Sequence, residues 1–368
     1  MTRPSALAPL DVATRAGRVR AELDEAGCDA LVVTDLTNVR WLTGFTGSAG
    51  VLVVRPHDLV IVTDGRYQEQ AADQLAAAGV TAEIEITRDT AGRLATVLDG
   101  TDRVGLEADH VTWWIQQQWA QALSSTLVPT QGLVLGLRAV KDDGEVDRLQ
   151  RAAAIADAAL ADVRHLLREQ PTERELARAL ESAMLDHGAD GPSFETIVAS
   201  GPNGARPHAR PSDRVIGATG DGELVVIDFG ALCDGYHSDM TRTFVVGEPS
   251  ATQARMLEVV RASQAAGVAA VRAGVPTIAV DQACRAVIDE AGWSDAFVHG
   301  TGHGIGLVIH EEPRLSPEST ALLAPGHCVT VEPGVYLPEH GGVRIEDSVV
   351  VTAAGCRHLT ASPYDPAP

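Results

Sequence analysis

Positive charge is scarce in this chain. Only 29 of its 368 residues are lysine or arginine, against 50 aspartates and glutamates, and Lys141 is the single lysine. With a net charge of −21, the chain has no basic face for a phosphate backbone, so nucleic acid is not expected as a partner.

Paired cysteines and long apolar runs are also missing. The five cysteines are scattered and form no CxxC pair, which disfavours a zinc–thiolate site and indicates reduced thiols. No apolar run is long enough to span a bilayer, and the first 27 residues lack the apolar segment of a secretory signal. We therefore expect a cytoplasmic protein with no membrane partner.

The length of 368 residues predicts two domains, and the sequence pattern changes near residue 136. Strand and helix patterns alternate before that point, which predicts an α/β domain over residues 1–136. The expected strands are 30–34, 51–54, 59–63, 82–86 and 103–106, and the expected helices are 12–26, 67–78 and 91–98.

Residues 137–368 predict an α+β domain with antiparallel hairpins. A long amphipathic stretch over 141–167 comes first, and a capping box from Thr172 to Glu175 opens a helix that ends at Gly188. Short strand patterns dominate after Phe194, with helices expected at 253–272 and 278–291.

Two aspartates lie on a predicted β-hairpin of this second domain. Asp228 ends an apolar strand, Asp239 begins the next, and Asp234-Gly235 between them is a strong type I′ turn signal. That loop places Asp228 opposite Thr241, whereas a loop one residue earlier places it opposite Asp239. Both registers gather the two carboxylates on one face of the sheet.

Two glutamates have the parity to face each other in a second hairpin. Glu332 precedes a Pro/Gly-rich turn and Glu346 follows the return strand, so an odd-numbered loop places them opposite. Arg344 shares the face of Glu346 through the strand period of two. Like charges in this arrangement need a positive group between them.

A histidine framed by glycines completes the set. His303 lies among four glycines, which allow backbone and substrate to approach closely. Each of these signals alone fits ordinary turn or loop chemistry. Together, four carboxylates and one imidazole suit a pair of divalent cations that share a water, which favours a metal-dependent hydrolase.

The motifs that carry these residues resemble those of the pita-bread metallopeptidases. They are 227–230, 235–244, 299–306, 331–336 and 344–347. Within that family the chain is similar to Xaa-Pro dipeptidases (prolidases) and Xaa-Pro aminopeptidases, and residues 35–45 and 63–67 resemble their creatinase-like N-terminal domain. The resemblance implies such an α/β domain over 1–136 and an α+β pita-bread catalytic domain over 137–368.

The resemblance also implies a dinuclear metal site. Asp228 would hold one cation, His303 and Glu332 the other, and Asp239 and Glu346 would bridge both. A hydroxide shared by the cations would attack the scissile carbonyl, and Glu332 would pass a proton toward the proline nitrogen. Mostly oxygen ligands favour Mn²⁺, although Co²⁺, Zn²⁺ or Fe²⁺ could occupy the same residues.

Further roles follow from the same resemblance. His310 would stabilise the oxyanion, His208 and His299 would line the substrate pocket, and Arg344 would orient the metal ligands. Arg314 either binds the free carboxylate of a dipeptide or is a surface arginine. The first alternative favours a dipeptidase, and an open pocket would instead favour an aminopeptidase on longer peptides.

Three other expectations accompany this interpretation. Thr241 either bonds Asp239 or is an ordinary strand threonine. A catalytically silent peptide-binding module is a less favoured alternative, because such modules typically lose ligands and all five are present. A homodimer is expected by similarity, with Asn38, Arg40 and Trp41 as contact candidates, unless Trp41 belongs to the core.

Overall fold

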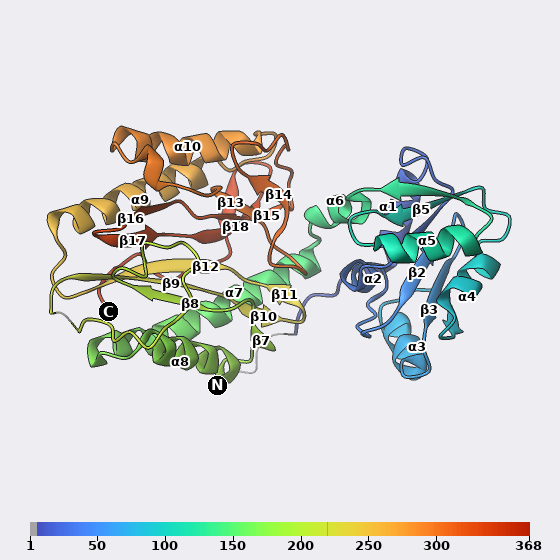
Figure 1. The fold of residues 1–368 in the computed structure, drawn as a ribbon, viewed down its shortest axis with the longest axis horizontal. Coiled ribbons are helices and arrows are strands. Elements are labelled where there is room, and N and C mark those ends of the chain that lie inside the picture. Colours follow the sequence, from blue (N-terminus) through green and yellow to red (C-terminus); the bar gives the residue numbers. More distant parts are fainter. Residues whose placement is uncertain (1–5, 219) are drawn as a thin grey trace. The chain divides into compact units, whose positions relative to one another are not determined.

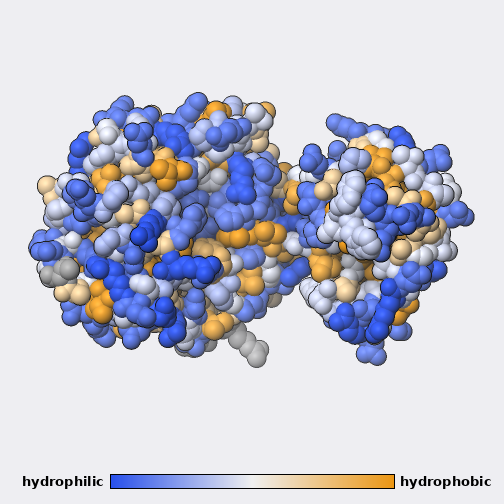
Figure 2. Space-filling model, in the orientation of Figure 1, coloured by the Kyte–Doolittle hydropathy of each residue, from blue (hydrophilic) through white to orange (hydrophobic). Residues whose placement is uncertain are grey.

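The structure is a computed structural model that describes residues 6–218 and 220–368. The chain forms two compact units, Pro9–Arg138 and Ala139–Pro368, of which the second also includes residues 6–8. Hydrophilic residues predominate on the face shown in Figure 2, with hydrophobic ones in small groups. Among the described residues, no helix is both long and apolar enough to cross a bilayer.

The first unit is built on a mixed six-stranded sheet (Figure 1). Its order is β4 (Glu83–Ile86), β3 (Leu59–Thr63), β2 (Val51–Val54), β1 (Ala30–Val33), β5 (Arg103–Glu107) and β6 (Thr126–Thr130). Strand β2 pairs antiparallel with both neighbours, and the other pairs are parallel. The central strands are apolar throughout because helices cover the sheet on both faces.

Six helices accompany this sheet. They are α1 (Val12–Glu22), α2 (Leu36–Thr43), α3 (Gln68–Ala77), α4 (Thr90–Val97), α5 (Trp113–Ala122) and α6 (Leu133–Ala139). The predicted strands and helices are all present to within a few residues, whereas α2, α5, α6 and β6 were not predicted.

The short helix α2 contains the three residues suggested for a subunit contact. Trp41 is 1% exposed, and the guanidinium groups of Arg15 and Arg18 lie 4.8 and 5.4 Å from its ring centroid. Asn38 is also buried, where it donates to Glu107 at 2.6 Å. Trp41 therefore belongs to the core of the first unit, which was the alternative interpretation, and the suggested contact role of Trp41 and Asn38 is wrong.

The second unit places strands between two pairs of helices. Helices α7 (Asp143–Val163) and α8 (Glu173–Asp186) lie on one side of the strands in Figure 1, and α9 (Ala251–Ala270) and α10 (Thr277–Glu290) lie on the other. Short 3₁₀ helices occupy Arg164–Glu169 and Ser294–Ala296. The capping box from Thr172 to Glu175 at the start of α8 is confirmed.

The strands of this unit form several small sheets. One has the order β12 (Met240–Val246), β9 (Glu223–Phe229) and β8 (Ile197–Ser200). A five-stranded sheet has the order β14 (Glu311–Leu315), β13 (Gly302–Gly304), β15 (Cys328–Val331), β18 (Asp347–Val351) and β19 (Cys356–His358). Two smaller sheets complete the unit. One is the pair of β16 (Gly334–Leu337) and β17 (Gly341–Arg344), and the other has the order β11 (Tyr236–His237), β10 (Ala231–Cys233) and β7 (Gly191–Pro192).

Two hydrophobic cores hold these layers together. In one, Leu160 of α7 and Leu180 of α8 pack with Ile227 and Phe244 of the first sheet. In the other, residues of α9 and α10 such as Met256 pack with Val331 and the strands near it. Because each set of strands buries one face against its own helix pair, the opposite faces are free to build a polar site between them.

Candidate metal centre and substrate pocket

The strand period of two places the ligand-type residues on the polar faces of the strands. On β9, Ile227 and Phe229 point into the core beneath α7 and α8, so Asp228 points the other way. On the far side, Val331, Val343 and Ile345 belong to the core beneath α9 and α10. Their even-numbered neighbours therefore turn toward Asp228; these are Glu332, Arg344 and Glu346.

The first hairpin has the register expected from Asp234-Gly235. Thr241 pairs with Asp228 across β9 and β12, and Cys233 pairs with Tyr236 around the turn. The turn residues have φ values of 46° and 74°, the left-handed conformation that a type I′ turn requires. Of the two registers that the sequence allowed, the one with Asp228 opposite Thr241 is confirmed.

The second pair of carboxylates lies where two short ladders meet. Val331 pairs with Asp347 in one ladder, and Gly334 pairs with Arg344 in the next. The strands are paired in the same register in both ladders. Glu332 and Glu346, which lie at the junction between the ladders, are therefore opposite each other. The parity expected for these glutamates is therefore confirmed.

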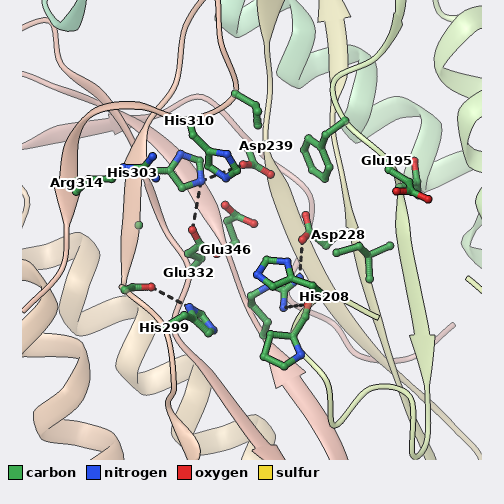
Figure 3. A pocket seen from close by; sticks show the side chains of 18 of the residues that line it. Glu195, His208, Asp228, Asp239, His299, His303, His310, Arg314, Glu332 and Glu346 are labelled. Atoms are coloured by element: carbon green, nitrogen blue, oxygen red, sulfur yellow. Dashed lines mark hydrogen bonds and ion pairs between the residues drawn. The ribbon is translucent and has the colours of Figure 1, made fainter. Parts of the chain in front are cut away.

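One cavity of about 530 Å³ collects every residue that the sequence singled out for the site. Figure 3 shows the side chains converging on it from several strands and loops. The predicted residues that line it are Asp228, Asp239, His303, Glu332, Glu346, His208, His299, His310, Arg314 and Arg344.

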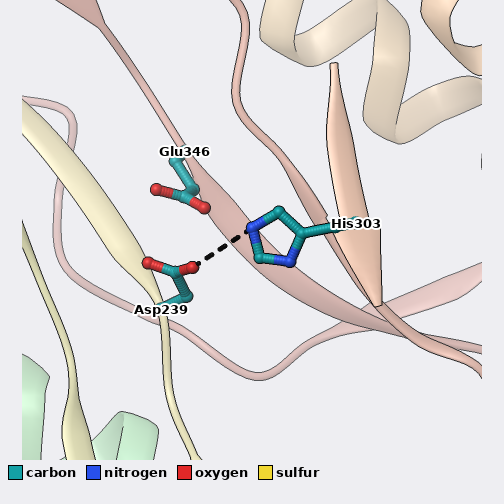
Figure 4. A group of neighbouring side chains, drawn as sticks. All are labelled: Asp239, His303 and Glu346. Carbon is teal, nitrogen blue, oxygen red and sulfur yellow. Dashed lines mark ion pairs between the residues drawn. The ribbon is translucent and has the colours of Figure 1, made fainter. Parts of the chain in front are cut away.

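Three of these residues form a tight cluster (Figure 4). Asp239, His303 and Glu346 each offer one ligand atom, and those atoms lie within 4.8 Å of one another. His303 Nε2 is also 3.4 Å from Glu332 Oε1. This spacing suits a shared cation. Without a cation, the negative charges of the carboxylates would repel each other at this distance.

The imidazole of His303 is oriented for binding through one nitrogen. Its Nδ1 lies 3.0 Å from the backbone oxygen of Gly304, so Nδ1 carries the proton and Nε2 presents a lone pair to Asp239 and Glu332. Burial lowers the pKa of His303 to about 3, which keeps the ring neutral at physiological pH. A neutral imidazole is the form that binds a metal ion.

The carboxylates are crowded and poorly neutralised by the protein. Burial, followed by the charge of Glu346, raises the pKa of Asp239 well above its usual range. Burial also raises the pKa of Glu332 to about 8 and that of Glu346 well above normal. Asp228 Oδ1 and Glu346 Oε1 are buried with no hydrogen-bond partner among the described residues.

Unpartnered buried oxygens are costly, and so is a cluster of buried negative charges. A divalent cation would remove both costs, because it would bind the unpartnered oxygens and neutralise the negative charge of the carboxylates. Four carboxylates and one neutral imidazole therefore fit a divalent metal site.

Arg344 supports this cluster from the side. Its Nη2 donates to Asp228 Oδ2 at 2.5 Å, and its Nε donates to Thr241 Oγ1 at 3.1 Å. The hydroxyl of Thr241 in turn donates to Glu346 Oε2 at 2.7 Å. Of the two interpretations of Thr241, the bond to Asp239 is wrong, because Thr241 lies opposite Asp228 and its hydroxyl faces Glu346, which lies between β17 and β18.

His310 and Arg314 lie at the open side of the pocket. The His310 ring is 4.4 Å from that of His303, edge to face, and partial desolvation against the pocket wall, followed by the charge of Arg314, lowers its pKa. His310, Arg314 and His208 are all exposed, so their polar groups can reach a bound molecule.

His299 lines the same pocket but uses both ring nitrogens within the protein. Nδ1 lies 2.8 Å from the oxygen of Gly300, and Nε2 lies 3.0 Å from the hydroxyl of Tyr336. That hydroxyl donates to Nε2 and accepts from Arg344 Nη1 at 2.8 Å. Burial lowers the pKa of His299 to about 4, so this neutral ring is fixed in orientation.

The sequence interpretation missed several residues of the site. Tyr336 lies four residues after Glu332, and the strand period could have indicated that it shares the same face. Phe194, Glu195 and Arg210 also line the pocket, and Glu195 pairs with Arg210 at 3.2 Å. These three lie in loops, where no periodic signal marks them.

Two family models match the chain. The model of metallopeptidase family M24 matches residues 147–353, and that of the creatinase/prolidase N-terminal domain matches residues 15–140. These matches confirm the expected fold class, an α/β creatinase-like domain followed by an α+β pita-bread domain.

Characterised relatives and solved structures agree with these matches. The Xaa-Pro dipeptidase of Pyrococcus furiosus is 32% identical over 340 residues, which are 92% of this chain and 95% of the relative. An Xaa-Pro dipeptidase structure from Bacillus anthracis has a TM-score of 0.91 at 40% identity and covers 95% and 98% of the two chains. An X-Pro aminopeptidase structure from Thermotoga maritima has a TM-score of 0.84 at 32% identity and covers 92% and 97%.

Proposed function

The chain belongs to metallopeptidase family M24, and we propose that it is a metal-dependent exopeptidase that hydrolyses the Xaa-Pro bond of dipeptides. The observation that carries the proposal is the group of four carboxylates, two buried and two partly buried, that lines a peptide-sized cavity together with a buried neutral imidazole. Relatives named Xaa-Pro dipeptidase align over nearly the whole chain, which supports the choice of substrate.

The metal site would hold two divalent cations, most simply Mn²⁺. Asp228 would bind one cation, His303 and Glu332 the other, and Asp239 and Glu346 would bridge them. Bound cations of this kind lower the pKa of water to near neutrality and polarise the scissile carbonyl. The predominance of oxygen ligands supports Mn²⁺, and Co²⁺, Zn²⁺ and Fe²⁺ are alternatives.

Glu332 and His310 would perform the proton transfer and the charge stabilisation. Glu332 is held by Thr330, whose hydroxyl donates to it at 3.2 Å, and its carboxylate faces the cavity. It is placed to accept a proton from the attacking water and to return it to the proline nitrogen as that bond breaks. His310 would donate a hydrogen bond to the carbonyl oxygen as negative charge develops there.

Two further residues would position the substrate, and a third would position the metal ligands. Arg314 would bind the free carboxylate of a dipeptide, because its exposed guanidinium borders the cavity and suits a planar two-oxygen partner. His208, at the cavity wall, would contact the substrate backbone. Arg344, through its bond to Asp228, would hold the metal ligands in place.

An Xaa-Pro aminopeptidase that acts on longer peptides is the second candidate. His208 and Arg314 are exposed at the cavity, which would admit a longer chain, and the Thermotoga maritima relative bears this name. A catalytically silent binding module is disfavoured. A peptide-binding surface has no need for buried carboxylate oxygens without hydrogen-bond partners.

The test is cleavage of an Xaa-Pro dipeptide and a matched Xaa-Pro-Yaa tripeptide after chelation and reconstitution with Mn²⁺. We expect hydrolysis of the dipeptide and little of the tripeptide. Preference for the tripeptide would replace the dipeptidase with an aminopeptidase. Cleavage of neither, with Mn²⁺ bound, would support the binding module.

We also propose that the protein is a cytoplasmic homodimer, and that residues 1–136 and 137–368 are its N-terminal and catalytic domains. Light scattering at micromolar concentration tests the dimer, and a monomer would contradict it.

A further inference from the structure

A buried carboxylate directly after Glu346 accepts four hydrogen bonds from side chains. Asp347 is 1% exposed, and it accepts from Arg242 Nη2 at 2.7 Å and from Gln264 Nε2 at 2.7 Å. It also accepts from Thr360 Oγ1 at 2.8 Å and from the hydroxyl of Tyr364 at 2.6 Å. These four hydrogen bonds hold the Asp347 carboxylate in a fixed position.

Arg242, the positive partner of Asp347, reaches the backbone of the site. Its Nη1 donates to the carbonyl oxygen of Glu346 at 2.5 Å and to that of Thr241 at 2.9 Å. Its Nη2 donates to the carbonyl oxygen of Ser362 at 2.7 Å. One buried guanidinium therefore joins β12, the segment that carries Glu346 and the segment 360–364.

The segment 360–364 is itself anchored. The backbone N–H groups of Ala361 and Ser362 donate to Asp157 of α7 at 2.9 and 2.8 Å. The ring of Tyr364 lies 4.8 Å from the Arg242 guanidinium and 5.6 Å from that of Arg261. Tyr364 thus adds an aromatic contact and a hydrogen bond to the same ion pair.

This network contacts Glu346 through its backbone, and Arg242, Asp347 and Tyr364 are not among the residues that line the cavity. Arg242 holds the backbone of Glu346, while Thr241 binds one carboxylate oxygen and leaves the other without a partner. If the backbone shifted, the free oxygen would move relative to Asp239 and His303. Groups behind a metal ligand typically change metal affinity when they are altered.

We propose that Asp347, Arg242 and Tyr364 are positioning residues that set the affinity of the site for divalent cations by fixing Glu346. The inference rests on the proposed role of Glu346 as a ligand. It assigns the segment 360–364, which is remote from the cavity, a function in metal binding.

The test compares Asp347→Asn and Tyr364→Phe with the wild-type full-length protein. Mn²⁺ affinity is measured by calorimetry on chelator-treated protein, and melting of the metal-free protein is recorded separately. We expect Asp347→Asn to weaken Mn²⁺ binding about tenfold and Tyr364→Phe about threefold. Dipeptide hydrolysis by both variants should recover when Mn²⁺ is raised to saturation.

Tyr67→Phe is the matched control, because its hydroxyl pairs with Ser48 within the first unit. It should bind Mn²⁺ with wild-type affinity. Wild-type affinity in Asp347→Asn and Tyr364→Phe, whatever their melting temperatures, would overturn the inference. If Asp347→Asn does not fold, Tyr364→Phe decides by the same criterion. Absence of Mn²⁺ binding by the wild type would instead refute the metal centre itself, and the inference with it.

Discussion

Thr241 donates a hydrogen bond from Oγ1 to Oε2 of Glu346 at 2.7 Å, and this bond joins the two strand layers that build the site. The same hydroxyl accepts from Arg344 Nε at 3.1 Å. The threonine therefore orders one oxygen of Glu346 and leaves Oε1, which has no partner among the described residues, directed at the cluster.

Replacing Thr241 by valine should weaken Mn²⁺ binding by about tenfold or more, because Glu346 loses the donor that orients it while the side-chain shape is kept. Calorimetric titration with Mn²⁺ measures this. Thr130→Val is the control, since this threonine is also buried on a strand but its hydroxyl donates to the backbone oxygen of Leu106 in the first unit. Equal affinity in Thr241→Val and wild type would show that this bond does not matter for binding.

His310→Ala should retain its metal and lose about 100-fold in turnover, the scale of losing one donor to an oxyanion. Metal content and kcat for an Xaa-Pro dipeptide are measured on the same sample. His358→Ala, an exposed histidine on β19, controls for the loss of an imidazole elsewhere. Loss of metal from His310→Ala would assign this residue to the metal site instead.

Arg314→Gln should raise KM for a dipeptide by about 10- to 100-fold, because a hydrogen-bonded charge pair with the free carboxylate is removed. The matched substrate is the same dipeptide as its C-terminal amide, which has no carboxylate to lose. If KM rises equally for both substrates, Arg314 does not recognise the carboxylate.

His327 should destabilise the metal-free protein as the pH drops from about 6.5 to about 4, whereas Asp239, Glu332 and Glu346, whose pKa values are raised, act in the opposite direction. Burial lowers the pKa of His327 from 6.5 to about 4, and its Nδ1 accepts a hydrogen bond from the N–H of Ala324 at 3.2 Å. As the pH drops, His327 is protonated in the unfolded chain before it is protonated in the folded protein. The contribution of His327 to the free energy of unfolding is therefore complete above pH 6.5 and declines until the folded protein is protonated as well.

When the pH drops across this range, the free energy of unfolding should therefore change more favourably in His327→Gln than in the wild type. Chemical denaturation in the presence of a chelator, at pH 7.5 and pH 5, gives the comparison. The exposed His358→Gln should keep the wild-type dependence. An unchanged dependence in His327→Gln would show that His327 does not contribute.

Strand periodicity explains why part of the site could be predicted. Asp228 lies between buried Ile227 and Phe229, and the Asp234-Gly235 turn specifies a register, so parity indicated a shared face for each pair of carboxylates. The roles of His208, His299, His310 and Arg314 came only from the family resemblance. The same pattern predicted the strands of the first unit closely, as at Val51–Val54 and Leu59–Thr63.

The remaining features depend on contacts between segments far apart in the chain. The partner of Thr241 is set by how two strand layers pack, and no local pattern contains that information. Helix α2 had local signals, since Asp35 caps its start and Gly44 ends it with a φ of 75°, but it is only eight residues long. Trp41 was ambiguous because an apolar residue on so short a helix fits a core and a subunit contact equally well.

If Asp228, Asp239, His303, Glu332 and Glu346 form the metal centre of a peptidase, loss of Asp239 must remove metal and activity together, so both are measured in Asp239→Ala. Asp213→Ala, an exposed aspartate of the same unit, is the control. After reconstitution with Mn²⁺, we predict that Asp239→Ala loses bound metal and Xaa-Pro dipeptide hydrolysis together, while Asp213→Ala keeps both. Full metal content and full activity in Asp239→Ala would contradict the account.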